Sequence, residues 1–189
     1  GLGVWVPLVA QTTSGFVLMA RNTGYEDQIL LWGEPLLPFP GLGSYLKNGY
    51  GLVDAYGCES HHTVVLSPES PYRNLEIINQ PVFDTQPFAS AYRQGRYLTH
   101  VVYKNGVWTS FLAENTGYTA QKAVVNRRKF PTEQLEPLLA QQWRITDVTF
   151  GDNTWVVVLS KGSGWGEQKI WEVRSAQDKQ LQDWIAQGW

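Results

Sequence analysis

The alternation of hydrophobic and polar residues predicts a unit of strands in the C-terminal part of the chain. Residues 144–150 (Arg-Ile-Thr-Asp-Val-Thr-Phe) alternate with a period of two, which is typical of a half-buried strand. Residues 151–153 (Gly-Asp-Asn) have the composition of a tight turn, and residues 155–159 form a short β-branched run that indicates a buried strand. A third strand is expected at 169–173, and the apolar spacing of 177–187 predicts a helix. The unit therefore has three strands and one short helix.

The same order of elements is predicted upstream. Strands are expected at 108–112 and 121–125 and a helix at 132–142, whose start is favoured by Pro131 and Glu133. The corresponding helix of the first unit is the least clearly defined, because prolines precede it and glycines interrupt it. These residues are Pro35, Pro38, Pro40, Gly41 and Gly43.

Two sets of aromatic residues repeat with nearly the same interval, which predicts four repeat units. The segment Asn-Thr-Gly-Tyr occurs at 22–25 and again at 115–118, and Gly-Trp-Gly-Glu-Gln at 164–168 has a similar frame. The aromatic residues of these loops are Tyr25, Tyr72, Tyr118 and Trp165, at intervals of 47, 46 and 47 residues. The second set is Tyr50, Tyr97, Trp143 and Trp189, at intervals of 47, 46 and 46 residues. The units span approximately 1–49, 50–96, 97–142 and 143–189, and the second is degenerate because Leu75 replaces a glutamine.

A closed ring is the expected arrangement of these units. One unit of this size cannot bury its apolar face alone, and an open stack of units requires polar ends. Both ends of the chain are apolar, with Val-Trp-Val at 4–6 and Trp184, Ile185 and Trp189 near the C-terminus. We therefore expect one domain, residues 1–189, that is mainly β and closes four pseudo-symmetric repeats into a propeller-like ring. Because propeller blades have four strands rather than three and a helix, a toroid of α and β elements stays open as an alternative.

Composition and charge exclude several classes of protein. The 189 residues are 13% aromatic and 17% charged, which is too aromatic and too apolar for a disordered chain. A net charge of −2 offers no basic surface for nucleic acid or anionic membranes, and no apolar run approaches the roughly 18 residues of a membrane-spanning helix. Cys58 is the only cysteine, which excludes an intramolecular disulfide and a multi-cysteine zinc site. One reduced cysteine and the lack of an N-terminal signal favour a cytoplasmic location.

The repeated motif resembles a known family of repeats. Residues 155–160 (Trp-Val-Val-Val-Leu-Ser), followed by Gly164, Trp165 and Gln168 and later by a Trp-x-x-Gly-Trp-like segment, are similar to repeats in the C-terminal region of plant casein-kinase-I-like kinases. Similar repeats follow caspase-like peptidase domains in bacteria. The resemblance covers the first, third and fourth units well and the second poorly. It implies an accessory domain for binding or regulation, part of a larger kinase- or peptidase-associated protein, and it carries no catalytic residue across.

The glycine-aromatic-x-x-glutamine loops are the first candidate binding site. Their residues are Tyr25, Gln28, Tyr118, Gln121, Trp165 and Gln168. Glycine permits a tight turn that fixes the direction of the ring, and the glutamine amide both donates and accepts hydrogen bonds. Such loops suit a protein segment or a carbohydrate. The alternative is that ring and amide only lock one unit to the next, as recurring residues of repeat proteins usually do.

A second candidate comes from the residues eighteen positions before each loop aromatic. They are Pro7, Asp54, His100 and Asp147, and all lie in the first strand of a unit. If these strands are innermost, Asp54, His100 and Asp147 converge on the axis of the ring, where they would bind a cation or perform acid–base chemistry. If the strands are half-exposed, the three side chains face solvent. We assign no metal ligand and no catalytic residue, and keep this axial cluster as an alternative.

Three further features have simpler interpretations. Cys58 precedes His61 and His62, but consecutive strand residues point to opposite faces, so a nucleophile or metal pair is not favoured. The basic cluster 127–129 is typical of a solvated turn. Small residues five positions before each loop aromatic indicate close approach of neighbouring units; they are Ala20, Ser67, Ala113 and Ser160.

The sequence thus favours a non-catalytic binding or regulatory module. Its expected partner is a protein segment or a carbohydrate, with no cofactor, nucleic acid or membrane. Two alternatives stay open: an enzyme or metal-binding protein that uses the axial cluster, and a structural or oligomerisation domain.

Overall fold

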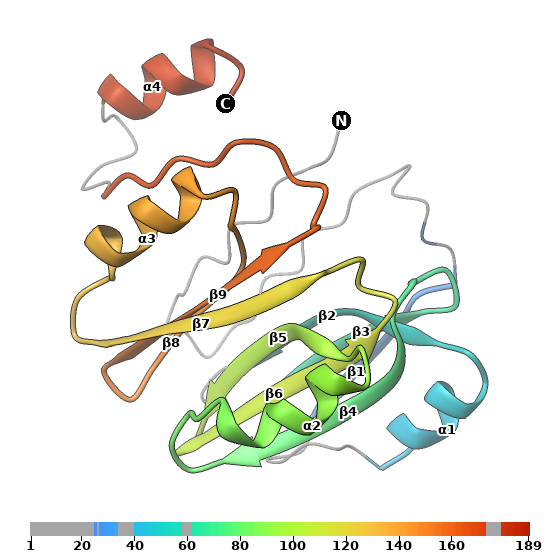
Figure 1. The fold of residues 1–189 in the computed structure, drawn as a ribbon. Coiled ribbons are helices and arrows are strands. Elements are labelled where there is room, and N and C mark those ends of the chain that lie inside the picture. Colours follow the sequence, from blue (N-terminus) through green and yellow to red (C-terminus); the bar gives the residue numbers. More distant parts are fainter. Residues whose placement is uncertain (1–24, 26, 34–39, 58–61, 173–178) are drawn as a thin grey trace.

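Three small antiparallel sheets of three strands each, with short helices between them, make up the fold (Figure 1). The computed structural model describes residues 25, 27–33, 40–57, 62–172 and 179–189. The chain is mainly β, as the alternating pattern predicts. The sheets do not close into a ring within these ranges, and residues 1–24, about half of the first sequence unit, lie outside them.

In each sheet, the strand that comes first in the chain lies at one edge. The two strands that follow form a hairpin, and the second strand of this hairpin is the central strand of the sheet. The first sheet, ordered β1-β3-β2, consists of β1 (Ile29–Gly33), β2 (Gly51–Gly57) and β3 (His62–Ser67). The second, ordered β4-β6-β5, consists of β4 (Arg73–Gln80), β5 (Tyr97–Lys104) and β6 (Val107–Glu114). The third, ordered β7-β9-β8, consists of β7 (Ala120–Arg127), β8 (Arg144–Gly151) and β9 (Thr154–Lys161). The helices are α1 (Leu42–Lys47), the 3-10 turn η1 (Gln86–Phe88) with α2 (Ala89–Arg93), α3 (Thr132–Ala140) and α4 (Lys179–Ala186).

The second and third sheets each combine strands from two successive sequence units. β4 belongs to the unit 50–96, yet its hydrogen-bonded partner is β6 of the unit 97–142. β7 likewise pairs with β9 of the unit 143–189. Neighbouring units are therefore interlocked by backbone hydrogen bonds, and one unit taken alone does not contain a complete sheet.

Most of the predicted elements are present at the predicted places. β6, β7, β8 and β9 cover the corresponding ranges, and α3 begins at the predicted residue 132 and ends at Ala140, two residues before the predicted end. α1 begins after the prolines, with Gly41 at its N-cap at a φ of 89°. The third strand predicted at 169–173 is not formed between Lys169 and Glu172, because a strand needs a hydrogen-bonded neighbour and no described strand pairs with this segment. Val173 and the first two residues of the helix predicted at 177–187 lie outside the described residues.

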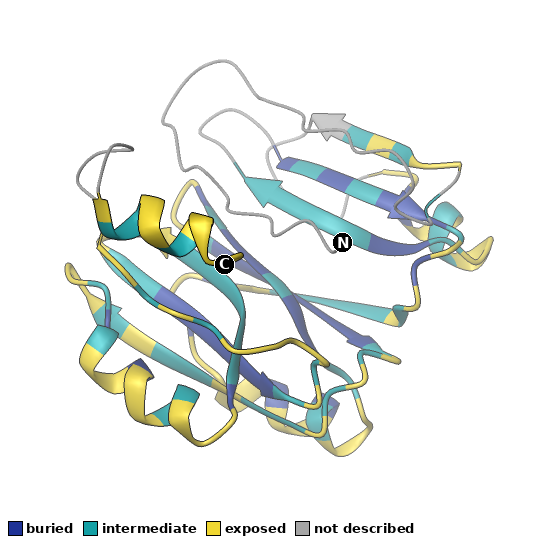
Figure 2. Ribbon diagram, turned by 90° about the horizontal axis from the view of Figure 1, so that it is seen from above, coloured by how far each residue is buried: buried dark blue, intermediate teal, exposed yellow. Residues whose placement is uncertain are grey.

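The central strands β6 and β9 are buried on both faces, because the sheets pack face to face, whereas β3 alternates between buried and half-buried residues. Phe111 of β6 packs with residues of the first sheet, whereas the next residue, Leu112, packs with Val156 and Val158 of the third. Val157 of β9 packs on the other side in a cluster that includes α3. The central strands stand out as buried bands in Figure 2. This double burial explains why residues 155–159 form an apolar run instead of an alternating pattern.

The strands β2, β5 and β8 are the inner strands, where the three sheets meet. β5 contacts both β2 and β8. Gly151, at the end of β8, lies so close to β5 that an added Cβ atom would be 2.1 Å from the ring of Tyr103. The first strand of each hairpin therefore occupies the innermost place, which is the condition that the axial cluster requires.

Candidate functional site

A β-bulge occurs at the same position of all three inner strands. The pairing register shifts just before Asp54 in β2, His100 in β5 and Asp147 in β8. A bulge inserts one residue into a strand and turns the neighbouring side chains relative to the sheet. The bulges thus aim the three residues that the sequence register groups together.

These three side chains form what we call the inner-strand joint: Asp54, His100 and Asp147. His100 Nε2 lies 3.4 Å from Asp54 Oδ1, a contact that links the first two sheets. Asp147 Oδ2 accepts a 2.7 Å hydrogen bond from the backbone N–H of Val101, which links the third sheet to the second. The hydroxyl of Thr149 on β8 donates to the carbonyl of the same Val101. The side chain of His100 is 19% exposed and that of Asp54 is 39% exposed, so the joint is largely closed to water on the His100 side.

Burial shifts the proton affinities of this joint. It raises the pKa of the Asp147 carboxyl to about 7, because it disfavours the charged form; hydrogen bonds from the N–H groups of Val101 and Val148 oppose the shift, and the charge of Asp54 adds to it. Burial lowers the pKa of His100, against the attraction of Asp54. Nδ1 of His100 is buried and lacks a hydrogen-bond partner within the described part of the chain.

Two loop tyrosines bring hydroxyl groups to the joint. Burial raises the pKa of the Tyr72 phenol, and a hydrogen bond with Tyr118 opposes this. Burial also raises the pKa of Tyr118, which interacts further with Tyr72, Thr146 and the Asp147 carboxylate. The ring of Tyr118 packs edge-on against Tyr97 with 6.3 Å between centroids. The aromatic loop position and the axial position, treated separately in the sequence, therefore meet in one polar cluster.

The loop glutamines hydrogen bond to the backbone of a neighbouring inner strand. Gln121 Oε1 accepts the N–H of Leu98 at 2.7 Å, and its Nε2 donates to the Leu98 carbonyl at 2.8 Å and to the Ser160 hydroxyl at 3.0 Å. Gln168 makes the corresponding pair of bonds to Ile145, at 2.7 and 2.9 Å. These contacts are the ones that the packing interpretation of the loops requires.

The degenerate second unit makes a related link with different residues. Leu75 stands at the glutamine position, and the hydroxyl of Ser70 donates to the carbonyl of Leu52, which is the counterpart of Leu98 and Ile145. Arg73 fixes this loop by donating to the carbonyls of residues 68, 70 and 72.

The other sequence candidates are dispersed. Tyr25 is partly buried, Gln28 is exposed and Trp165 is 51% exposed. Pro7, Ala20, Cys58 and His61 lie outside the described residues. Within the described ranges, no group of three or more His, Cys, Asp or Glu residues is placed to hold a metal ion. No helix among the described residues is long and apolar enough to cross a membrane.

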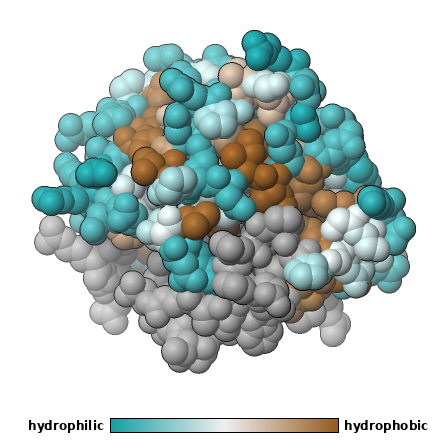
Figure 3. All heavy atoms as spheres, turned by 90° about the horizontal axis from the view of Figure 1, so that it is seen from below, coloured by the Kyte–Doolittle hydropathy of each residue, from teal (hydrophilic) through white to brown (hydrophobic). Residues whose placement is uncertain are grey.

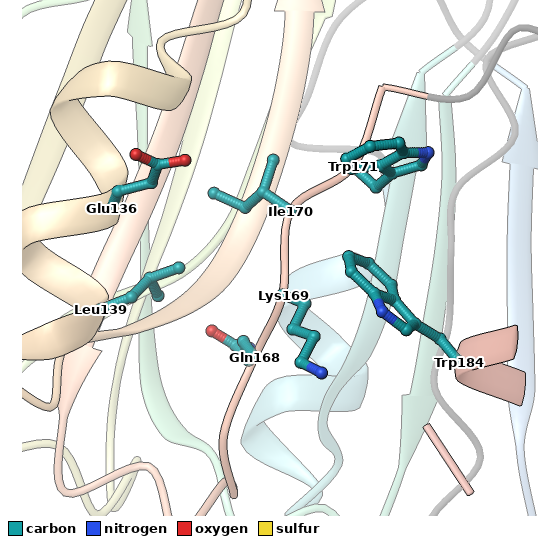
Figure 4. A pocket seen from close by; sticks show the side chains of 7 residues that line it. All are labelled: Glu136, Leu139, Gln168, Lys169, Ile170, Trp171 and Trp184. Atoms are coloured by element: carbon teal, nitrogen blue, oxygen red, sulfur yellow. The ribbon is translucent and has the colours of Figure 1, made fainter. Parts of the chain in front are cut away.

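A groove that the sequence analysis did not identify lies between α3 and the C-terminal segment, and we call it the aromatic groove (Figure 4). It has a volume of about 360 Å³ and is lined by Glu136, Leu139, Gln168, Lys169, Ile170, Trp171 and Trp184. The rings of Trp171 and Trp184 meet edge to face with 5.8 Å between centroids. Lys169 Nζ lies 4.9 Å from the Trp184 ring centroid and 3.8 Å from that of Trp189. The sequence feature that could have indicated this groove is the high frequency of tryptophan after residue 164.

Comparison with known proteins finds no matching family model, no matching curated protein and no matching solved structure.

Proposed function

We propose that this chain is a non-catalytic binding module that recognises a protein segment in the aromatic groove. The observation that carries the proposal is the groove of about 360 Å³, in which the half-exposed ring of Trp171 lies beside Trp184. Tryptophan is enriched among the residues that contribute most to protein interfaces, because its ring has a large apolar area and one polar N–H. An exposed indole in a concave site therefore supports a role in recognition.

Exposed apolar side chains in the C-terminal segment also support a binding site at the aromatic groove. Four large exposed ones lie in the last 25 residues and are 45–55% exposed: Trp165, Trp171, Ile185 and Trp189. On the face shown in Figure 3, hydrophobic residues gather in patches between hydrophilic ones. Charges of both signs, from Glu136 and Lys169, line the groove and would orient a bound segment.

The four-unit closed ring is part of this proposal. Its support is the recurrence of one sheet order three times and the face-to-face packing of successive sheets. The first two core clusters each combine two sheets and a helix, whereas the third combines β9, α3 and Ile170 of the C-terminal segment. A fourth unit would complete the third cluster in the way that the sequence period predicts.

Replacement of Trp171 tests the binding function. The full chain is screened against a displayed library of random peptides and, in parallel, against a glycan array. We expect a peptide ligand whose affinity falls at least about tenfold in Trp171→Ala, because that substitution removes the exposed wall of the groove.

Trp165→Ala is the matched control, since Trp165 is equally exposed but does not line the groove. It should bind the peptide as the parent chain does. Ligands found on the glycan array alone would assign the groove to carbohydrate instead. A chain that binds neither and whose mass rises with concentration would be an oligomerisation domain, and the proposal would then be wrong.

A further inference from the structure

The inner-strand joint collects one titratable side chain from each of the three sheets. If the imidazole of His100 is neutral, ionised Asp54 and Asp147 place two negative charges in a space that is partly closed to water. Like charges in such a place favour the uptake of a proton, and the proton is shared by the interacting groups as a set. The other titratable groups around Asp147 are the phenols of Tyr118 and Tyr72.

We propose that the inner-strand joint is a proton-controlled coupling between the three sheets, in which protonation of Asp147 strengthens the packing of β8 on β5, the strand that also contacts β2. An oxygen of the protonated acid still accepts the N–H of Val101, so the link between the second and third sheets is kept. One buried charge beside Asp54 is removed at the same time, which lowers the cost of bringing the sheets together.

The direction of the pH effect follows from the pKa shifts. The pKa of Asp147 rises from the usual 3.8 to about 7 on folding, so its contribution to stability is complete below pH 3.8 and is lost as the pH rises through about 7. His100 acts oppositely: its pKa falls on folding from the usual 6.5, so its contribution is present above pH 6.5 and is lost as the pH falls through the lowered value. Above pH 6.5 the change in stability is thus governed by Asp147.

The melting temperature of the full chain between pH 6.5 and 8.5 tests the proposal. The parent chain should lose about 2–4 °C over this range, because the folded state releases a proton that the unfolded state has already lost. Asp147→Asn keeps a side-chain oxygen for Val101 and cannot ionise, so its melting temperature should change by less than about 1 °C. Asp152→Asn, at the exposed turn of the same hairpin, should follow the parent chain.

A pH slope in Asp147→Asn equal to that of the parent chain would overturn the proposal. If that variant does not fold, the carboxyl of Asp147 is titrated by ¹³C NMR in the parent chain. A midpoint near 7 supports the coupling. A midpoint below about 5, close to an ordinary aspartate, overturns it.

Discussion

At the scale of single residues, the loop glutamines show how a recurring side chain holds neighbouring units together. Gln121 and Gln168 each use both the oxygen and the nitrogen of the amide on one backbone residue of an inner strand. The strands that they contact, β5 and β8, are edge strands of their sheets, so their outward N–H and C=O groups lack a partner within the sheet. The amide supplies that partner and joins one sheet to the next.

Substitution of Gln121 by leucine should therefore be costly. The backbone N–H and C=O of Leu98 would lose their partners, and we expect the free energy of unfolding to fall by about 2–3 kcal/mol in a denaturant titration. Gln134→Leu, on the exposed surface of α3, is the control and should change it by less than about 0.5 kcal/mol. Equal effects of the two substitutions would contradict the role of the amide.

At the scale of elements, the inner strands approach so closely that glycine is needed at their contacts. An added Cβ at Gly151 of β8 would lie 2.1 Å from Cγ and 2.4 Å from Cβ of Tyr103 on β5. An added Cβ at Gly51 of β2 would lie 2.3 Å from the carbonyl oxygen of Tyr72. Glycines at these two places let the backbone of one sheet touch the next loop or sheet.

A methyl group at position 151 should separate β8 from β5. We expect Gly151→Ala to lower the free energy of unfolding by about 1–3 kcal/mol, because the ring and Cβ of Tyr103 must move. Gly166→Ala is the matched control, since an added Cβ there meets nothing within 4 Å. Thermal unfolding that ranks the two variants in the opposite order would show that the contact is not tight in solution.

At the scale of the whole molecule, stability depends on the stacking of sheets more than on any one sheet. β6 and β9 are buried on both faces, and each core cluster draws on elements from two or more parts of the chain. A sheet whose central strand is apolar on both faces would expose one of those faces to water if it stood alone, and covering that face stabilises the fold. The molecule is therefore expected to unfold as one cooperative unit.

The proposed ring closure makes the first sequence unit essential to that stacking. A chain that lacks residues 1–24 should melt at least about 5 °C below the full chain. In the proposed ring, residues of the first unit cover the third core cluster, and the truncated chain would leave that cluster exposed to water. Circular dichroism during heating measures the difference. Identical melting curves would mean that the described sheets do not need the first unit, and the ring would have to be abandoned.

The candidate site could be predicted from the sequence in part. The register that selects Asp54, His100 and Asp147 is a matter of counting, because a repeated fold places residues of the same register at equivalent positions. The hydroxyls of Tyr72 and Tyr118 could not be assigned to the same cluster, because their distance from Asp147 depends on how the loops turn back toward the inner strands. The aromatic groove could not be predicted from the sequence for a similar reason. Its lining residues come from α3, from α4 and from the segment between β9 and α4, and only the tertiary structure brings these elements together.

The sequence alone determined the repeat of about 47 residues and the places of β6 to β9 and α3. These properties are local, because strand periodicity, turn composition and β-branched runs act within a few residues. The tertiary structure decided that β4 and β7 pair with the hairpin of the following unit, that both faces of β6 and β9 are covered, and that the loop amides bind backbone. Those outcomes depend on contacts between groups that lie tens of residues apart in the sequence. Several backbone partners and apolar surfaces are available to each group, and the local sequence pattern does not indicate which one it contacts in the fold.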